Sequence, residues 1–157
     1  MSNLQIANIL FNIATILDEA QDNPYRVRAY RHAARRVLAL GESARAILAR
    51  GEELPLPGVG TRMRRKLAEL IATGRLGFYE ELLEEQPAHV RSLLRIEGVG
   101  PKTAARLYQD LGISTPEGVL AAAQVGAIHS VYGFGERREA SLAYAASFAA
   151  GTLSCVA

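Results

Sequence analysis

The stretch Leu56-Pro57-Gly58-Val59-Gly60 occurs twice more in variant form, as Ile96-Glu97-Gly98-Val99-Gly100 and as Val131-Tyr132-Gly133-Phe134-Gly135. Each copy has an apolar residue two positions before its first glycine. Each also has a leucine seven positions after its second glycine, namely Leu67, Leu107 and Leu142. Three registers with matching flanks indicate an internal repeat of one structural unit, because a single glycine-rich turn would not reproduce its surroundings.

The sequence around these repeats predicts helices. Apolar side chains in residues 3–20 recur at intervals of three and four, behind a Ser2–Gln5 pair that fits a capping box. Asn23-Pro24 is typical of a helix start, and no segment alternates like a β-strand. We therefore predict an all-α helical bundle with two or three helix–turn–helix hairpins. The predicted helices cover residues 3–20, 24–40, 42–50, 61–73, 78–85, 87–95, 101–111, 116–124 and 136–149, with cap glycines at Gly74, Gly112 and Gly151.

The repeated pattern is suited to binding an anion. Two glycines let the chain turn sharply, and a helix starts directly after the second one. The first N–H groups of that helix lack partners within the helix and lie at its positive dipole end, where a phosphate can bind without a charged side chain. The residues between the glycines, Val59, Val99 and Phe134, are expected to turn inward and lock the hairpin.

Charge is distributed unevenly along the chain. Residues 1–79 hold 12 Lys and Arg against 7 Asp and Glu, whereas residues 80–157 hold 6 against 9. The first half is therefore where an anionic partner is expected. All but two of the basic residues are arginines, and the two lysines are Lys66 and Lys102.

Composition also excludes several classes of protein. A single cysteine, Cys155, forbids an internal disulfide framework or a Cys-rich zinc site, and three scattered histidines argue against a histidine metal site. No apolar run is long enough to span a membrane, and no basic flank leads into an apolar run at the start. A cytoplasmic, nucleoid-associated location without membrane contact is expected.

The three repeats resemble helix-hairpin-helix motifs, which bind the DNA backbone without reading its sequence. A closer likeness is carried by residues 23–35, by Leu56-Pro57-Gly58-Val59-Gly60-Thr61 and by residues 72–76. Together they resemble the amino-terminal region of X-family DNA polymerases. The resemblance implies a small lyase-like domain with the first hairpin at 1–79, a second helix-hairpin-helix domain with two hairpins at 80–151, and a tail at 152–157.

The resemblance also implies a set of DNA-binding residues. Besides the two glycines of each hairpin, Val59 and Val99, basic side chains on two predicted helices are expected to contact phosphate. On a helical projection Arg62, Arg65 and Lys66 share one face. The other expected contacts are Arg26, Arg28, Tyr30, Arg31, Arg35 and Arg75 in the first half, and Lys102, Gly98, Gly100, Gly133 and Gly135 in the second.

Lys66 occupies the position of the family's lyase nucleophile, a lysine that forms a Schiff base with the sugar aldehyde of a 5′-deoxyribose phosphate. Neighbouring cations are expected to lower its pKa and favour the neutral amine. Two departures weaken this interpretation. Arg65 stands where DNA polymerase β has an acidic residue, and the basic residue that some relatives have before the first hairpin is replaced around Leu54.

Polymerisation is not expected from these residues, because the chain has only three aspartates, Asp18, Asp22 and Asp110, and no Asp-x-Asp pair to hold two metal ions. The resemblance implies no cofactor beyond an optional Na⁺ or K⁺ at hairpin carbonyls. Those carbonyls belong to Leu54, Leu56 and Val59 in the first hairpin and to Leu94, Ile96 and Val99 in the second.

Three functions stay open on the sequence alone. The first is sequence-independent binding of gapped, nicked or 5′-phosphorylated DNA by a monomer, alongside a separate repair polymerase or nuclease. The second is a metal-independent 5′-deoxyribose phosphate or abasic-site lyase that uses Lys66. The third is a protein-interaction scaffold whose hairpins do not touch DNA.

Overall fold

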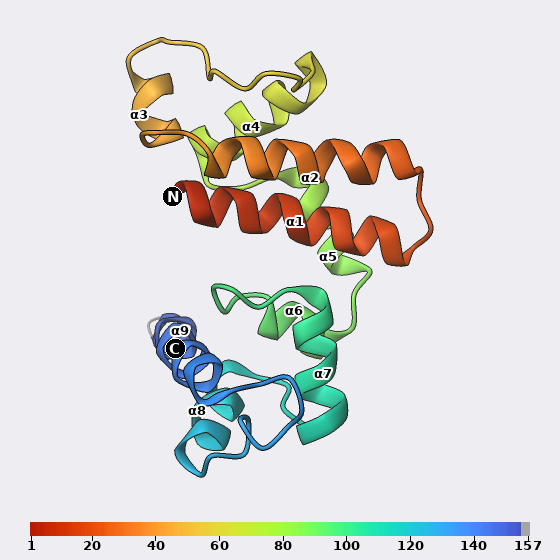
Figure 1. The fold of residues 1–157 in the computed structure, drawn as a ribbon, viewed down its shortest axis with the longest axis vertical. Helices are drawn as coiled ribbons and strands as arrows, with labels where there is room; N and C mark the ends of the chain where they lie inside the picture. Colours follow the sequence, from red (N-terminus) through yellow and green to blue (C-terminus); the bar gives the residue numbers. More distant parts are fainter. Residues whose placement is uncertain (155–157) are drawn as a thin grey trace. The chain divides into compact units, whose positions relative to one another are not determined.

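The structure is a computed structural model that describes residues 1–154, and the regular structure in that range is α-helical without any strand (Figure 1). The predicted all-α fold is confirmed. The helices are α1 (Asn3–Glu19), α2 (Pro24–Leu38), α3 (Ala44–Ala49), α4 (Thr61–Thr73), α5 (Gly77–Glu84), α6 (Ala88–Leu93), α7 (Pro101–Leu111), α8 (Pro116–Gln124) and α9 (Glu136–Ser154).

Capping residues fix the helix ends where the sequence predicted them. Ser2 and Gln5 form the reciprocal capping box of α1, and the Asn23 side chain accepts a hydrogen bond from the Tyr25 N–H at the start of α2. Gly74 and Gly112 end α4 and α7 in the left-handed conformation, with φ of 73° and 66°. Glycine adopts this conformation without the steric penalty that a Cβ atom would bring.

The end of α9 differs from the prediction. Gly151 was expected to cap the helix and residues 152–157 to form a tail, but α9 continues to Ser154. One glycine inside a helix costs only about 1 kcal/mol relative to alanine and does not by itself end it. Residues 155–157, the rest of the predicted tail, lie outside the described part of the chain.

The chain divides into two compact units, Met1–Glu85 and Gln86–Ala157. The predicted boundary between residues 79 and 80 falls inside α5, which belongs to the first unit. Phe78, Tyr79 and Leu82 of α5 pack against the core of that unit. Because α5 contributes side chains to the core of the first unit, the boundary between the two units lies after this helix.

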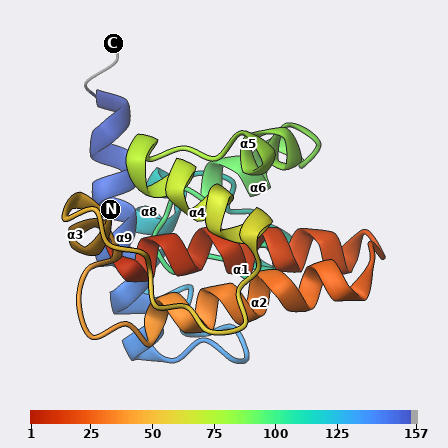
Figure 2. The ribbon, with the colours of Figure 1, turned by 90° about the horizontal axis from the view of Figure 1, so that it is seen from above.

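The first unit is built on a pair of neighbouring helices, α1 and α2, which lie side by side in both ribbon views (Figures 1 and 2). Helix α4 contacts both of them and brings the first hairpin to α2. The core between these helices is fully buried and aliphatic, and its larger members include Ile6, Leu10, Ile13, Val37, Leu67 and Leu70. Burying each such side chain stabilises the fold by about 1.5–3 kcal/mol.

The second unit has its own core, formed by α6 to α9 and the two hairpin turns between them. The leucines that follow the second and third glycine repeats, Leu107 and Leu142, are both buried in it. Leu67 has the equivalent role in the first unit. The leucine seven positions after each repeat therefore anchors the second helix of each hairpin.

Candidate functional site

The three glycine repeats form the same turn. The N–H of the residue between the glycines donates to the carbonyl three residues earlier, over 3.2 Å from Val59, 3.0 Å from Val99 and 3.0 Å from Phe134. The first glycine of each repeat is left-handed, with φ of 75° at Gly58, 81° at Gly98 and 87° at Gly133. A positive φ at the third position of a four-residue turn is typical of type II.

The residue between the glycines locks each turn to a core, as predicted. Val59, Val99 and Phe134 are 8%, 3% and 7% exposed. Because these side chains turn inward, the second glycine and the helix start after it remain at the surface in the first and third hairpins and half-buried in the second, where Gly100 lies.

The helix starts differ between the hairpins. Gly60 and Gly100 are the N-caps of α4 and α7, and neither helix has a side-chain cap. The first turn of α4 thus presents uncapped N–H groups, whereas α7 begins with Pro101, which has no N–H. Helix α9 has two carboxylates in its first turn, Glu136 and Glu139, whose negative charge disfavours an anion there.

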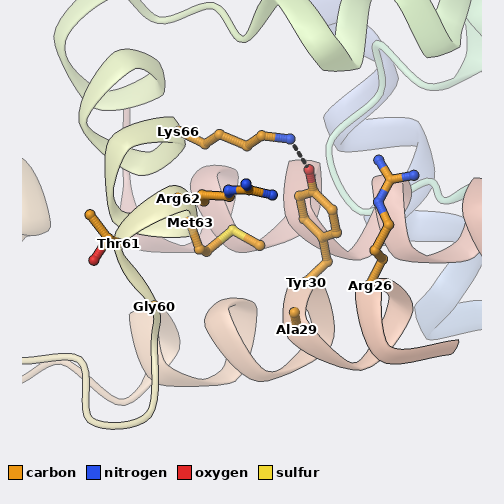
Figure 3. A pocket seen from close by; sticks show the side chains of 8 residues that line it. All are labelled: Arg26, Ala29, Tyr30, Gly60, Thr61, Arg62, Met63 and Lys66. Carbon is orange, nitrogen blue, oxygen red and sulfur yellow. Dashed lines mark hydrogen bonds between the residues drawn. The ribbon is translucent and has the colours of Figure 1, made fainter. Parts of the chain in front are cut away.

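An open pocket of about 760 Å³ lies between the N-terminus of α4 and the side of α2 (Figure 3). It brings together two segments that the sequence analysis had singled out separately. Three of its lining residues are cationic, Arg26 from α2 and Arg62 and Lys66 from α4. The remaining lining residues are Ala29, Tyr30, Gly60, Thr61 and Met63. Ala29 is exposed and lines this pocket.

Lys66 crosses the pocket toward α2, as Figure 3 shows, and its Nζ donates a hydrogen bond of 2.5 Å to the Tyr30 hydroxyl. The same Nζ lies 4.0 Å from the centre of the Phe78 ring. Burial lowers the pKa of Lys66 and the nearby Arg26 lowers it further, while Glu69 and Glu81 act in the opposite direction. The predicted direction is confirmed, but the cause is burial and Arg26 in place of Arg62 and Arg65.

Tyr30 serves as a wall of the pocket. The side chain is 3% exposed, and its ring stacks on Phe78 with centroids 6.1 Å apart. Burial raises the pKa of Tyr30 to about 12, so the hydroxyl stays protonated at neutral pH. A ring this buried cannot stack on a DNA base. Tyr25, the other tyrosine of the segment, is 72% exposed and has the Arg28 guanidinium over its ring.

Other predicted phosphate contacts lie outside the pocket lining. Arg31 pairs with Asp18 at 2.8 Å, and Arg75 pairs with Glu80 at 2.6 Å. Arg26 is shared, since it lines the pocket and also bonds Asp22 at 3.0 Å. Part of the positive excess of the first unit is thus neutralised internally. Arg28, Arg35 and Arg65 are exposed on α2 and α4 but do not line the pocket.

The second and third hairpins are tied to each other by two arginines. Arg138 of α9 donates a hydrogen bond of 2.9 Å to the Gly98 carbonyl in the turn of the second hairpin. Arg106 of α7 donates in return to the Tyr132 carbonyl in the turn of the third. Lys102 is exposed in the first turn of α7, between Gly98 and Arg106 in the sequence.

The carbonyls predicted to hold a cation differ between the two hairpins. In the first, those of Leu54, Leu56 and Val59 all accept hydrogen bonds from Arg64. In the structure these three oxygens therefore already face one cation, the guanidinium. In the second hairpin Ala104 stands where the first has Arg64, and the donor set of Leu94, Ile96 and Val99 is composed of neutral, hard oxygens that suit Na⁺ or K⁺.

Sequence reasoning missed four participants. Phe78 faces Lys66 from α5, and only the fold brings it there. Arg106 and Arg138 bridge two turns through long side chains that helical periodicity does not place. Arg64 had a detectable signal, because it follows Gly60 by four residues where the other repeats have Ala104 and Glu139.

None of the helices in residues 1–154 is long and apolar enough to cross a membrane. That range also contains no group of three or more His, Cys, Asp or Glu side chains placed to hold a metal ion.

Comparison with known proteins connects this geometry to a class of folds. Residues 1–76 match the family described as a helix-hairpin-helix domain, and residues 90–146 match a SAM-like helix-hairpin-helix tandem. The chain is 30% identical over 139 residues to the DNA polymerase/3′-5′ exonuclease PolX of Bacillus subtilis. It is 38% identical over 55 residues to DNA polymerase lambda of Arabidopsis thaliana.

The coverage of these matches is unequal. The Bacillus alignment includes 88% of this chain but 24% of that relative, and the Arabidopsis alignment includes 34% of this chain and 10% of that relative. The chain therefore spans about a quarter or less of the length of these polymerases.

Proposed function

We propose that this chain, which carries helix-hairpin-helix domains in both units and resembles the amino-terminal lyase and hairpin region of X-family DNA polymerases, binds DNA through its sugar-phosphate backbone. The observation that carries the proposal is the pocket at the start of α4. There, uncapped helix N–H groups meet Arg26, Arg62 and Lys66 in one cavity. A phosphate is the anion that such a site takes up without reading a base.

The preferred DNA is a gapped or nicked duplex with a 5′-phosphate. A pocket of about 760 Å³ has room for a terminal phosphate and the sugar beneath it, and Arg62 and Lys66 supply positive charge. Backbone phosphates within a continuous strand are joined to sugars on both sides, so a chain end enters a pocket more readily. The second hairpin, with Lys102 exposed in the first turn of α7, would bind the neighbouring backbone.

A fluorescence anisotropy comparison tests this proposal. Labelled gapped, nicked and intact duplexes are titrated, each with and without the 5′-phosphate. We expect the tightest binding to gapped, phosphorylated DNA and a loss of the phosphate preference in the double variant Arg62→Ala/Lys66→Ala. Arg45→Ala removes an exposed arginine of α3 that does not line the pocket, and it should retain the preference. Flat titrations at low salt would instead favour the protein-interaction scaffold.

A lyase reaction is the second candidate, favoured by the state of Lys66. Burial and Arg26 lower its pKa, and its Nζ already has a positioned partner in the Tyr30 hydroxyl. The neutral amine would add to C1′ of a 5′-deoxyribose phosphate with loss of water, giving an iminium. Water would then take up a C2′ proton as the C3′–O3′ bond breaks, which releases the downstream strand with its 5′-phosphate. Hydrolysis of the remaining imine would free the lysine.

Borohydride trapping on abasic DNA separates the lyase from simple binding. An adduct that maps to Lys66 and disappears in Lys66→Arg would support the enzyme, because arginine keeps the charge without forming a stable imine. The chain has only one other lysine, Lys102, so peptide mapping against it and the Met1 amine is simple. No adduct, or one that survives in Lys66→Arg, would leave only the binding function.

A monovalent cation at the second hairpin remains part of the proposal. The carbonyls of Leu94, Ile96 and Val99 would hold it, and it would supply positive charge beside a DNA phosphate. The corresponding carbonyls of the first hairpin bond the Arg64 side chain instead.

A further inference from the structure

Three backbone carbonyls of the first hairpin converge on one guanidinium. Arg64 Nε donates to the Val59 carbonyl over 3.0 Å. Its two Nη atoms donate to the Leu54 and Leu56 carbonyls, each over 2.7 Å. The guanidinium therefore bonds the first and last residues of the turn, Leu56 and Val59, and also Leu54 in the segment that leads into the turn.

The charge balance at this place depends on the carbonyls. Arg64 is partly shielded, with 30% of its side chain exposed, and the nearest carboxylate oxygen, on Glu53, is 3.9 Å away on a side chain that is 88% exposed. A screened contact of that length contributes little. Three carbonyl dipoles aimed at one point create a negative potential that requires a cation, and the planar guanidinium supplies it with donors in fixed directions.

The other two repeats show that this arrangement is specific to the first hairpin. The residue four positions after the second glycine is Arg64 in the first repeat, Ala104 in the second and Glu139 in the third. Ala104 is fully buried and carries no charge. Glu139 accepts hydrogen bonds from the backbone N–H and the ring Nδ1 of His129 instead.

We infer that Arg64 is a built-in cation of the first hairpin, which holds the turn in its binding geometry and excludes a monovalent metal ion from the carbonyls of Leu54, Leu56 and Val59. The first hairpin is accordingly indifferent to which alkali ion is present. Its order, and its affinity for phosphate, change with total ionic strength but not with the exchange of one monovalent cation for another.

An NMR titration of the full chain without DNA tests this inference and keeps it separate from the proposed function. Amide resonances of residues 54–60 are followed in ¹⁵N-labelled protein while tetramethylammonium chloride is replaced by KCl or NaCl at constant ionic strength. We expect no saturable shift in these resonances for the native chain. Arg64→Ala should show a saturable, K⁺- or Na⁺-specific shift there, because the vacated carbonyls would then take up an ion.

Arg65→Ala is the matched control, since it removes the same charge one residue further along α4 from an exposed side chain, and it should behave like the native chain. A saturable alkali-ion shift in the native hairpin would overturn the inference. So would an ion-insensitive hairpin in both Arg64→Ala and Arg64→Gln, the latter being neutral but closer in length to arginine.

If both variants fold but are too unstable for these resonances to be followed, thermal unfolding gives the answer. We then expect a higher Tm in KCl or NaCl than in tetramethylammonium chloride for the variants and equal Tm values for the native chain. Equal Tm values in all salts for the variants would contradict the inference.

Discussion

Arg138 donates a hydrogen bond of 2.9 Å to the carbonyl of Gly98, a residue 40 positions earlier in the chain. The bond joins the first turn of α9 to the turn of the second hairpin. With the bond from Arg106 to Tyr132, it makes the two hairpins of the second unit one structural entity.

Arg138→Ala is expected to destabilise the second unit by about 1 kcal/mol, the net contribution of one hydrogen bond to a charged group at the surface. Chemical denaturation monitored by circular dichroism measures this change. Arg137→Ala is the control, because Arg137 is equally exposed and makes no such bond within the described residues. It should cost less than about 0.5 kcal/mol. Equal losses in both variants would mean that the bond to Gly98 adds nothing.

Gly58→Ala is expected to be more disruptive than Gly98→Ala. Both positions are left-handed, which costs a residue with a Cβ atom about 1–2 kcal/mol. A Cβ at Gly58 would in addition lie 2.9 Å from the His32 ring, whereas none of the described atoms lies within 4 Å at Gly98. His32 also contacts the Pro57 carbonyl at 3.0 Å, and that contact would be displaced.

Urea titrations of the two variants test this difference. Gly60→Ala serves as the control, because Gly60 has a φ of −75° and open space around its Cα. Its free energy of unfolding should stay close to that of the native chain. A Gly98→Ala variant less stable than Gly58→Ala would contradict the role given to His32.

Arg62→Ala is expected to reduce the salt dependence of DNA binding. Each phosphate contact adds about −0.9 to the slope of log K against log salt concentration, so the slope should become less steep by about one. Anisotropy titrations on gapped DNA at several NaCl concentrations give this slope. An unchanged slope, equal to that of Arg45→Ala, would place Arg62 away from phosphate.

Trapping at Lys66 is expected to rise with pH and to level off below the ordinary lysine pKa of 10.5, because burial and Arg26 lower the pKa of Lys66 in the fold. Only the neutral amine attacks an aldehyde. Borohydride trapping rates measured from pH 6 to above pH 10.5 report this profile. A profile that still climbs like that of an exposed lysine would show that the pocket does not activate the amine.

Tyr30→Phe tests whether the hydrogen bond between Lys66 and Tyr30 contributes to trapping. It removes the hydroxyl that accepts the Lys66 hydrogen bond and keeps the stacked ring against Phe78. We expect the trapping rate to fall while DNA affinity is retained. A fall in both by the same factor would indicate loss of the pocket as a whole.

The His129–Glu139 pair is expected to stabilise the second unit most between about pH 4.5 and 6.5. The hydrogen bond to Glu139 raises the pKa of His129 above 6.5, and the bonds from His129 lower the pKa of Glu139 below 4.5. Stabilisation by protonated His129 is complete below pH 6.5 and is lost as pH rises through its folded pKa. Stabilisation by ionised Glu139 is complete above pH 4.5 and is lost as pH falls through its folded pKa.

Thermal unfolding across pH 3–9 checks this profile. His129→Gln should remove the decline on the alkaline side, and His89→Gln is the control because His89 stacks on Tyr108 without a carboxylate partner among the described residues. A native profile that matches that of His129→Gln would show that the pair does not contribute.

The fold and its repeats were largely predictable because they depend on local signals. Glycine punctuation, helix caps and the leucine after each repeat act within about ten residues, so the three hairpins and most helix boundaries followed from the sequence. The extension of α9 past Gly151 was missed, since a single glycine is compatible with both a cap and a helix interior.

The pocket was predictable only in part. Lys66, Arg62 and Arg26 were identified, but the burial that lowers the pKa of Lys66 comes from packing between separate helices. Arg64 shows the same limit more sharply. Its neighbours on α4 are basic too, and only the three-dimensional turn decides that this arginine faces inward while Arg65 faces solvent.

The division of the chain at Glu85 has a consequence for how the proposed function would operate. If both units bind DNA, two units with separate cores and their own hairpins would give the chain two binding sites for one DNA strand. Once one unit is bound, the other would be held near the DNA at a high effective concentration. The overall affinity would then exceed that of either unit alone. Dissociation of one unit would not release the protein, because the other unit would keep it on the DNA. The free unit could then rebind at a neighbouring position on the backbone.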